Sequence, residues 1–194
     1  MLSRRFFLVS MATIFFAGCG DYESGSRYVG SAENYELVEL TKQEKELVIS
    51  NIASVAGTPY VWGGDTVSKG FDCSGLIQWA YRRLGFGVFI NGTELYTEIT
   101  AHNLYHQNSF PFTSLVTPAN IDQLLERGDF IFFDENSDGR ITHNSVFDFV
   151  DATGGVWVWD SYSVDNIGVT HRIVKDFWSK GPIFAKPAKV VSKL

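Results

Sequence analysis

The sequence predicts an α+β fold in which helices come first and an antiparallel sheet follows. Two stretches in the first half carry apolar residues at helical spacing, and short apolar or alternating runs separated by Asp-Gly, Gly-Gly and Asn-Ile-Gly turns fill the second half. With 194 residues, 45% of them hydrophobic and 20% charged, the chain can bury one core and is too apolar for a disordered protein. This order of elements is typical of an α+β domain.

Residues 1–18 have the pattern of an export signal. Arg4 and Arg5 provide a basic start, and the apolar stretch from Phe6 to Ala17 is too short to span a bilayer, which takes about 20 residues. The motif FAGC resembles the lipobox of bacterial lipoproteins, which implies that Cys19 carries a lipid. A plain cleaved signal peptide, with Cys19 incidental, is the alternative. SRRFFL also resembles the twin-arginine signal, which leaves Sec and Tat export open.

Residues 19–36 are predicted to be a lipid-anchored flexible tether, because they are polar with little periodicity, and the folded domain is expected to span 37–194. Removal of residues 1–18 takes away two arginines and no acids, so the net charge moves from −6 to −8. An acidic chain of this kind is a poor partner for nucleic acid. We expect an exported bacterial lipoprotein, held by its N-terminal anchor to a membrane of the cell envelope or periplasm.

The first predicted helix covers residues 42–56. Thr41 followed by Glu44 is the signature of a capping box, and Gly57 and Pro59 end the pattern. The apolar positions between them recur at helical spacing: Leu47, Val48, Ile52 and Val55.

The second predicted helix begins at Cys73 in the stretch GFDCSGLIQWAYRRLG, residues 70–85. Asp72 is a suitable N-cap and Gly85 a suitable end. Cys73 then lies in the first helical turn, where the positive end of the helix dipole favours the reactive thiolate. If Cys19 carries a lipid, Cys73 is the one remaining thiol, which excludes an intramolecular disulfide and a zinc site built on several cysteines.

A cysteine nucleophile needs a base, and the chain offers four histidines. His102 and His106 could share a helix face, but Asn103 stands where a metalloprotease helix carries its glutamate, so two solvated histidines are favoured over a metal site. His171 lies in a late strand and is expected to face solvent. His143 opens the predicted strand HNSVFDFV and could face the start of a packed helix. A hydrogen-bonded structural histidine is the alternative.

The remaining predicted strands are apolar or alternating runs. They are DFIFF, GVWVWDSY, GVTHRIV and IFAKPAKVV.

Four features together resemble the NlpC-type family of papain-like bacterial cell-wall cysteine peptidases: PYVWGG at 59–64, GFDCSG at 70–75, GDFIFF at 128–133 and a strand that starts with His143. The resemblance covers roughly residues 44–188. It implies a papain-like arrangement, in which a nucleophile at a helix N-terminus packs against an antiparallel sheet that supplies the histidine. Cys73 would be the nucleophile, and His143 the base and then the acid.

The resemblance also assigns roles to four further residues. The third catalytic member of the family is usually His and sometimes Asn or Gln, and Asp160 aligns with it here; an aspartate can orient a histidine as in other triads. Tyr60 matches a tyrosine whose hydroxyl approaches the nucleophile and stabilises the oxyanion. Asp72 and Ser74 match positions that hold the free amino end of the substrate, while a helix cap and a first-turn hydroxyl are their structural alternatives.

The implied activity is hydrolysis of peptidoglycan stem peptides, at the bond from the γ-carboxyl of D-glutamate to the diamino acid, without a cofactor. An inactive wall-binding lipoprotein is one alternative, and a cysteine amidase or acyltransferase acting on another exported substrate is a second. The chain departs from the family pattern after His143, where it carries Asn144, Ser145 and Asp148. The segment 86–127 is longer than in the family and is expected to add substrate contacts or a lid.

One more pattern suggests a metal. DENSDGRITHNS fits the start of a calcium loop of the EF-hand type, but Ser145 stands where the bidentate glutamate belongs. The matching positions are Asp134, Asn136, Asp138, Gly139 and Ile141. A β-turn rich in Asp, Asn and Gly is the favoured interpretation, with no metal, and a structural calcium ion is the alternative.

Overall fold

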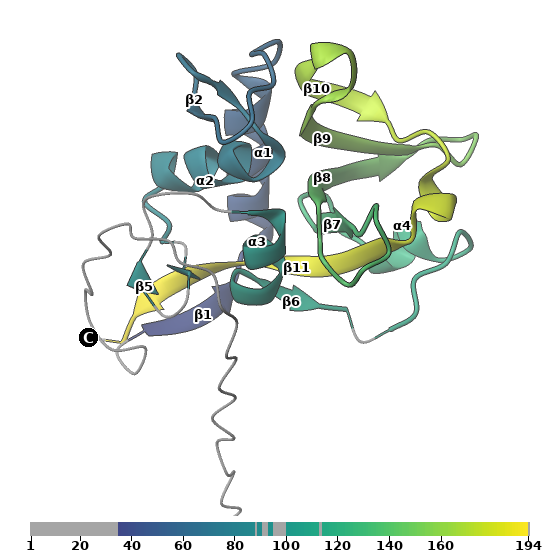
Figure 1. The fold of residues 1–194 in the computed structure, drawn as a ribbon. Helices are drawn as coiled ribbons and strands as arrows, with labels where there is room; N and C mark the ends of the chain where they lie inside the picture. The colour runs from purple at the N-terminus through teal and green to yellow at the C-terminus, as the bar shows by residue number, and fades with distance from the viewer. Residues whose placement is uncertain (1–34, 88, 91–92, 95–99, 113, 194) are drawn as a thin grey trace, which may run out of the picture.

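The computed structural model describes residues 35–87, 89–90, 93–94, 100–112 and 114–193. Its architecture is α+β, as predicted, with an antiparallel sheet beside the helices (Figure 1). The predicted signal peptide, Cys19 and the tether up to residue 34 lie outside the described residues. Within the described part of the chain, no helix is long and apolar enough to cross a membrane.

Helix α1 spans Lys42–Ala53 and has the predicted capping box, in which Thr41 and Glu44 each accept a hydrogen bond from the backbone of the other. It ends three residues before the expected position. The amide of Ser54 already bonds to carbonyls of the last helical turn, and the following amides form turns. Helix α2 spans Cys73–Arg83, and Asp72 is its N-cap, as predicted.

The main sheet of the described residues has the strand order β1-β11-β7-β8-β9-β10, and β6 also pairs with β11. The pairings are antiparallel. Each of the five predicted strands is present. The strands are β1 (Tyr35–Glu39), β6 (Ser109–Pro111), β7 (Phe130–Phe133), β8 (His143–Val150), β9 (Val156–Tyr162), β10 (Gly168–Ile173) and β11 (Pro182–Ser192).

Strand β1 was not predicted. It begins within the expected tether, and its first residue, Tyr35, pairs with Ser192 at the far end of β11.

Short elements connect these parts. Two hairpins pair β2 (Asp65–Thr66) with β3 (Gly70–Phe71) and β4 (Phe89–Ile90) with β5 (Thr93–Glu94). The other short elements are α3 (Ala101–Gln107), α4 (Ile121–Leu124), and the 3-10 turns η2 (Val164–Asn166) and η3 (Phe177–Lys180).

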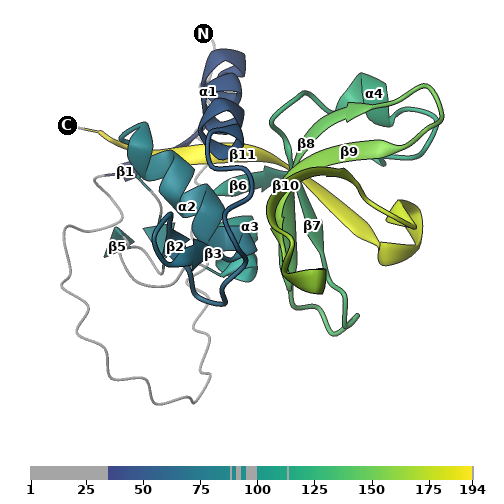
Figure 2. The same ribbon diagram turned by 90° about the horizontal axis from the view of Figure 1, so that it is seen from above.

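The sheet separates two hydrophobic clusters, because alternate residues of each strand face opposite sides. Helices α1 and α2 pack on one face, with Ile52 and Leu76 fully buried against Phe130 and Phe132 of β7. The neighbouring β7 residues, Ile131 and Phe133, enter the second cluster, which also contains residues of α4 and η3. Figure 2 shows α1 and α2 beside the fan of strands β7 to β10. The N-terminus of α2 thus lies next to β8 and β9.

A close contact between two backbones fixes the start of α2. A Cβ atom on Gly75 would lie 2.0 Å from the carbonyl oxygen of Gly64, and the same carbonyl accepts the Asp72 amide at 3.0 Å. The loop that carries PYVWGG is therefore packed directly against the first turn of α2. Only glycine at position 75 permits this approach.

We expect Gly75→Ala to destabilise the protein, although alanine normally favours a helix interior over glycine by about 1 kcal/mol. The added methyl group must displace the Gly64 carbonyl, and overpacking of this kind costs about 1–3 kcal/mol. Urea denaturation measures the change. Ser50→Ala, on the exposed face of α1, is the matched control and should change stability by less than about 0.5 kcal/mol. A gain in stability for Gly75→Ala would contradict the contact.

Candidate active site

Cys73 is held against the sheet at the start of α2. Its thiol is free, and the residue is 7% exposed. The side-chain amide of Asn144 donates to the Cys73 carbonyl at 3.1 Å, and the hydroxyl of Ser161 donates to the Phe71 carbonyl at 2.7 Å. Asn144 lies on β8 and Ser161 on β9. The strands that carry the candidate histidine and aspartate therefore also fix the backbone of the candidate nucleophile.

Asp72 joins the loop 59–64 to the helix. Its carboxylate accepts the amides of Gly75 at 2.6 Å and Gly63 at 2.9 Å, and the hydroxyl of Ser74 at 3.1 Å. Burial raises the pKa of Asp72 above its ordinary value, against the effect of these hydrogen bonds. The expected cap is confirmed. Asp72 and Ser74 also line the cleft described below. Their expected contact with the free amino end of a substrate stays a prediction.

His143 opens β8, as predicted, and connects the thiol to Asp160. Its Nε2 atom lies 2.9 Å from Oδ2 of Asp160, and its ring lies close enough to the Cys73 side chain for the thiol to affect its pKa. Because Nε2 faces Asp160, Nδ1 is the ring nitrogen left for the thiol. Burial alone would lower the pKa of His143, but the hydrogen bonds and charges of Asp160 and Cys73 raise it to about 10. The ring is therefore set to hold a proton beside the thiol.

Asp160 is a buried carboxylate with three partners. Its side chain is fully buried, and besides His143 it binds the hydroxyl of Ser145 at 2.9 Å and the guanidinium of Arg172 through both oxygens. Burial would raise the pKa of Asp160, but the hydrogen bonds and charges of His143 and Arg172 lower it. The sequence alone did not point to Ser145 or Arg172 as members of this site. No local motif marks Arg172, because only the pairing of β9 with β10 brings it to Asp160.

Tyr60 lies beside the thiol. Burial, together with the charges of Cys73, Asp72 and Glu135, raises the pKa of the Tyr60 hydroxyl to about 12. The hydroxyl therefore keeps its proton throughout the neutral range and can donate a hydrogen bond.

These groups open onto a cleft of about 520 Å³. Tyr60, Cys73 and His143 line it, and Trp62, which is 84% exposed, lines it from the loop 59–64. Further lining residues come from the loop 134–142 and the start of α3. It includes Thr100 and Ala101 from the segment 86–127, and the charged residues Glu135, Asp138 and Arg140. Asp160 does not line the cleft and is connected to it by its contact with His143.

The loop 134–142 forms a turn with its own aspartates. Asp134 accepts the amides of Asp138 and Gly139, and Asp138 accepts the amide of Arg140. Asn136 lines the cleft. The carboxylates considered as calcium ligands thus bind backbone amides of the loop, in agreement with the favoured turn. Among the residues that the structure describes, no three His, Cys, Asp or Glu side chains gather in a metal-binding arrangement.

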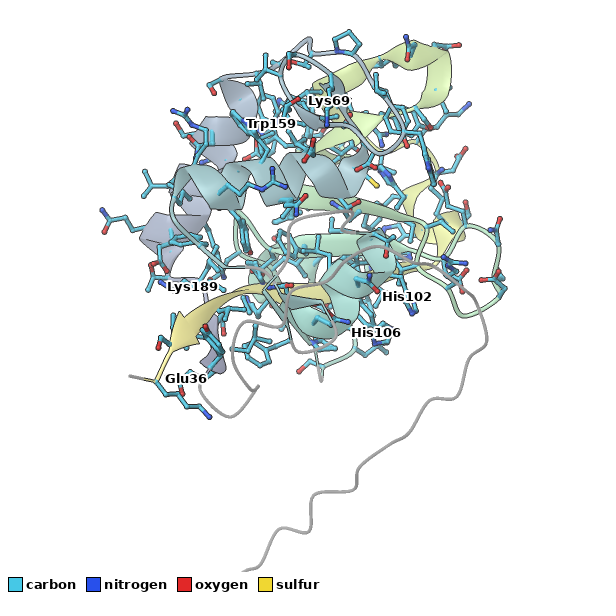
Figure 3. The ribbon with its side chains drawn as sticks, turned by 60° about the vertical axis from the view of Figure 1, so that its left-hand side comes forward. Glu36, Lys69, His102, His106, Trp159 and Lys189 are labelled. Carbon is cyan, nitrogen blue, oxygen red and sulfur yellow. The ribbon has the colours of Figure 1, made fainter. Side chains whose placement is uncertain are left out.

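The other histidines lie elsewhere. His102 and His106 lie together on α3 (Figure 3), and their ring centroids are 4.4 Å apart. His102 is partly buried, and its Nδ1 accepts the amide of Ile141 at 3.3 Å. His171 was expected to face solvent, but its side chain is only 28% exposed, because it stacks on Trp159 and lies 2.7 Å from Asp148. That prediction was wrong because β9 places the rings of Trp157 and Trp159 against His171.

Comparison with known proteins identifies relatives of the chain. The model of the NlpC/P60 family matches residues 57–180. The probable endopeptidase YafL of Escherichia coli is 31% identical over 157 residues, which are 80% of this chain and 55% of YafL. The murein DD-endopeptidase MepH of Escherichia coli is 26% identical over 170 residues, which are 85% of this chain and 55% of MepH. The chain thus spans about half the length of either relative.

A solved structure has the same fold. It is a lipoprotein-like protein of the NLP/P60 family from Staphylococcus aureus, with a TM-score of 0.50 and 19% sequence identity. The match covers 78% of this chain and 42% of that protein.

We expect Asp160→Asn to lower the pKa of His143 from about 10 by at least about one unit, because the negative charge that stabilises the imidazolium is lost. Nuclear magnetic resonance of histidine labelled with carbon-13 at Cε1 follows the four rings separately through a pH titration. Asp148→Asn, which alters the carboxylate beside His171, is the matched control and should leave the His143 midpoint in place. An unchanged His143 midpoint in Asp160→Asn would show that the carboxylate does not set the charge of this ring.

Proposed function

The chain belongs to the NlpC/P60 family, and from this premise we propose that it is a cysteine endopeptidase that hydrolyses the stem peptides of peptidoglycan. Cys73 is the nucleophile, His143 the base and acid, and Asp160 the group that orients His143. The observation that carries the proposal is the series Cys73–His143–Asp160, in which Cys73 and His143 line one cleft and Asp160 is hydrogen-bonded to the His143 ring.

In the first step the Cys73 thiolate attacks the carbonyl carbon of the scissile amide and a carbon–sulfur bond forms. The carbonyl oxygen becomes an oxyanion beside the Cys73 amide and the Tyr60 hydroxyl. The Cys73 amide is suited to this role because the first N–H groups of a helix have no partner within it. The imidazolium of His143 gives its proton to the departing nitrogen, the carbon–nitrogen bond breaks, and a thioester remains.

In the second step His143 acts in the opposite direction. The neutral ring takes a proton from water, the resulting hydroxide attacks the thioester, and the carbon–sulfur bond breaks. The products are a carboxylic acid and the restored thiolate beside the imidazolium. Asp160 stays ionised throughout and takes up no proton, because its role is to accept a hydrogen bond from Nε2 and so keep Nδ1 directed at the sulfur.

The charged wall of the cleft fits a stem peptide. Such a peptide carries both free carboxylates and free amino groups, and Arg140 can bind the former while Glu135 and Asp138 can bind the latter. By the resemblance of residues 59–64 and 70–75 to the family motifs, the proposed bond joins the γ-carboxyl of D-glutamate to the diamino acid. MepH is named a DD-endopeptidase, so a bond between two D-centres is the competing outcome.

The place of action follows from the substrate. A peptidoglycan hydrolase must be exported, which agrees with the basic and apolar residues 1–18, and a lipid on Cys19 would then hold the enzyme at a membrane. The acidic charge of the chain gives it no electrostatic attraction to nucleic acid.

We expect Cys73→Ala to abolish hydrolysis and leave the fold intact, because the substitution removes the nucleophile and leaves the Cys73 carbonyl to Asn144. Mass spectrometry of defined muropeptides after incubation with either protein measures this. Release of the L-Ala-D-Glu dipeptide by the native chain alone would identify both nucleophile and bond. Hydrolysis by Cys73→Ala would exclude Cys73 as the nucleophile. If the native chain cleaves no muropeptide, the result favours a wall-binding protein.

We expect Tyr60→Phe to lower kcat about 100-fold, or about 3 kcal/mol, with little change in KM, because the hydroxyl acts on the oxyanion and not on the bound substrate. Steady-state kinetics on the same muropeptide measures the two constants. Tyr105→Phe, on α3, is the matched control, because Tyr105 does not line the cleft and its ring packs on Phe132. A rise in KM at constant kcat would instead place the Tyr60 hydroxyl in substrate binding.

A further inference from the structure

Two histidines of the sheet have the same kind of support. His143 contacts Asp160, and Arg172 binds the same carboxylate. His171 contacts Asp148, to which Arg127 binds. Only the first set reaches the cleft, because His143 lines it together with Cys73, whereas His171 packs among aromatic rings. The chain therefore contains its own reference for what an arginine does beside a His–Asp pair.

Arg172 holds Asp160 in a fixed plane. Its Nε atom donates to Oδ1 at 3.0 Å, and its terminal nitrogen donates to Oδ2 at 2.5 Å. A forked contact of this kind fixes both the position and the plane of a carboxylate. Oδ2 is also the oxygen that faces Nε2 of His143. The orientation of the imidazole is thus determined by a carboxylate that Arg172 has already oriented.

Arg172 is itself held in place. Its side chain is 17% exposed, and its guanidinium carbon lies 3.7 Å from the centroid of the Tyr162 ring. Stacking on an aromatic face suits the planar guanidinium and would be lost with lysine. The ring of Tyr162 also lies 6.0 Å from that of His143.

We propose that Arg172 is a positioning residue of the active site, which directs His143 at Cys73 through Asp160 and offsets the charge that Asp160 exerts on the imidazole. This inference rests on the proposed function of Cys73 and His143. Without Arg172 the carboxylate would keep only the neutral hydroxyl of Ser145 besides His143, and no positive charge would offset its effect on the imidazole. The imidazolium would then hold its proton more tightly and would donate it less readily to the departing amine.

The part of the chain that the structure describes brings few charged or titratable groups to His143. Cys73 approaches from α2, Asp160 and Tyr162 from β9, and Arg172 from β10. Arg172 is the fixed positive charge in this set. A positive charge beside an imidazolium disfavours the protonated ring, so removal of Arg172 should raise the pKa of His143.

The first test is a histidine titration by nuclear magnetic resonance, with the full-length chain carrying Cys73→Ala so that the thiol does not contribute. We expect Arg172→Gln to raise the His143 midpoint by about one pH unit and Arg172→Lys to leave it nearly in place, because lysine keeps the charge. Arg127→Gln is the matched control. It removes the arginine of the other set and should leave His143 unchanged.

The second test separates orientation from charge. In the full-length chain with Cys73 intact, Arg172→Lys should lower kcat about 10-fold with little change in KM, because lysine cannot form the forked contact. The rate at which iodoacetamide alkylates Cys73 gives a readout that needs no substrate, and peptide mapping distinguishes Cys73 from Cys19. Alkylation of Cys73 should be slower in Arg172→Lys. Arg127→Lys should change neither rate.

The outcomes distinguish the two claims. If Arg172→Gln folds and its His143 midpoint stays in place or falls, the inference is overturned. If Arg172→Gln does not fold, the inference is overturned when Arg172→Lys has the same kcat and the same alkylation rate as the native chain. A native chain that cleaves no muropeptide overturns the proposed function instead, while a raised midpoint with slowed alkylation would still support the effect of Arg172 on His143.

Discussion

The active site depends on the distance between two backbones. The carbonyl of Gly64 occupies the space in which any other residue at position 75 would place its side chain. This contact lets the Asp72 carboxylate reach Gly63 in the loop and Gly75 in the helix at once. Tyr60 and Cys73 come from the two segments joined in this way, so the geometry between hydroxyl and thiol is set before any substrate arrives. Preorganised donors of this kind contribute most in catalysis, because they need no rearrangement during the reaction.

The second requirement is neutralisation of buried charge. An unpaired carboxylate inside a protein is strongly destabilising, and Asp160 avoids this with donors from three directions. The same physics appears in a second set of buried charges. There Lys45, which is 1% exposed, bridges the fully buried Asp129 and the exposed Glu126. None of these three residues lines the cleft, and their contacts join α1 to the segment that precedes β7. Similar ion pairs thus serve stability or function according to what lies beside them.

Local patterns determined how much could be predicted. The helix start at Cys73 and the strand start at His143 follow from capping residues and from periodicity over a few positions. Asp160 needed the family resemblance, because nothing adjacent to it marks a role. Arg172 and β1 could not be predicted, since both depend on pairing between strands, and β1 pairs with the opposite end of the chain. The burial of Lys45 could not be predicted for a related reason. A charged residue on a helix is ordinarily exposed, and its partner Asp129 is remote in sequence.

The hairpin of β9 and β10 makes Asp160 and Arg172 one unit. Thr170 lies directly opposite Asp160, so Arg172, two residues further, points to the same face and reaches the carboxylate diagonally. Insertion or deletion of one residue in the connection between the strands would shift the register and move Arg172 to the other face of the sheet. An aspartate at this place therefore constrains more than its own position. It requires a donor on the neighbouring strand and a connection of fixed length, which links an aspartate at position 160 to the geometry of β10 in this chain.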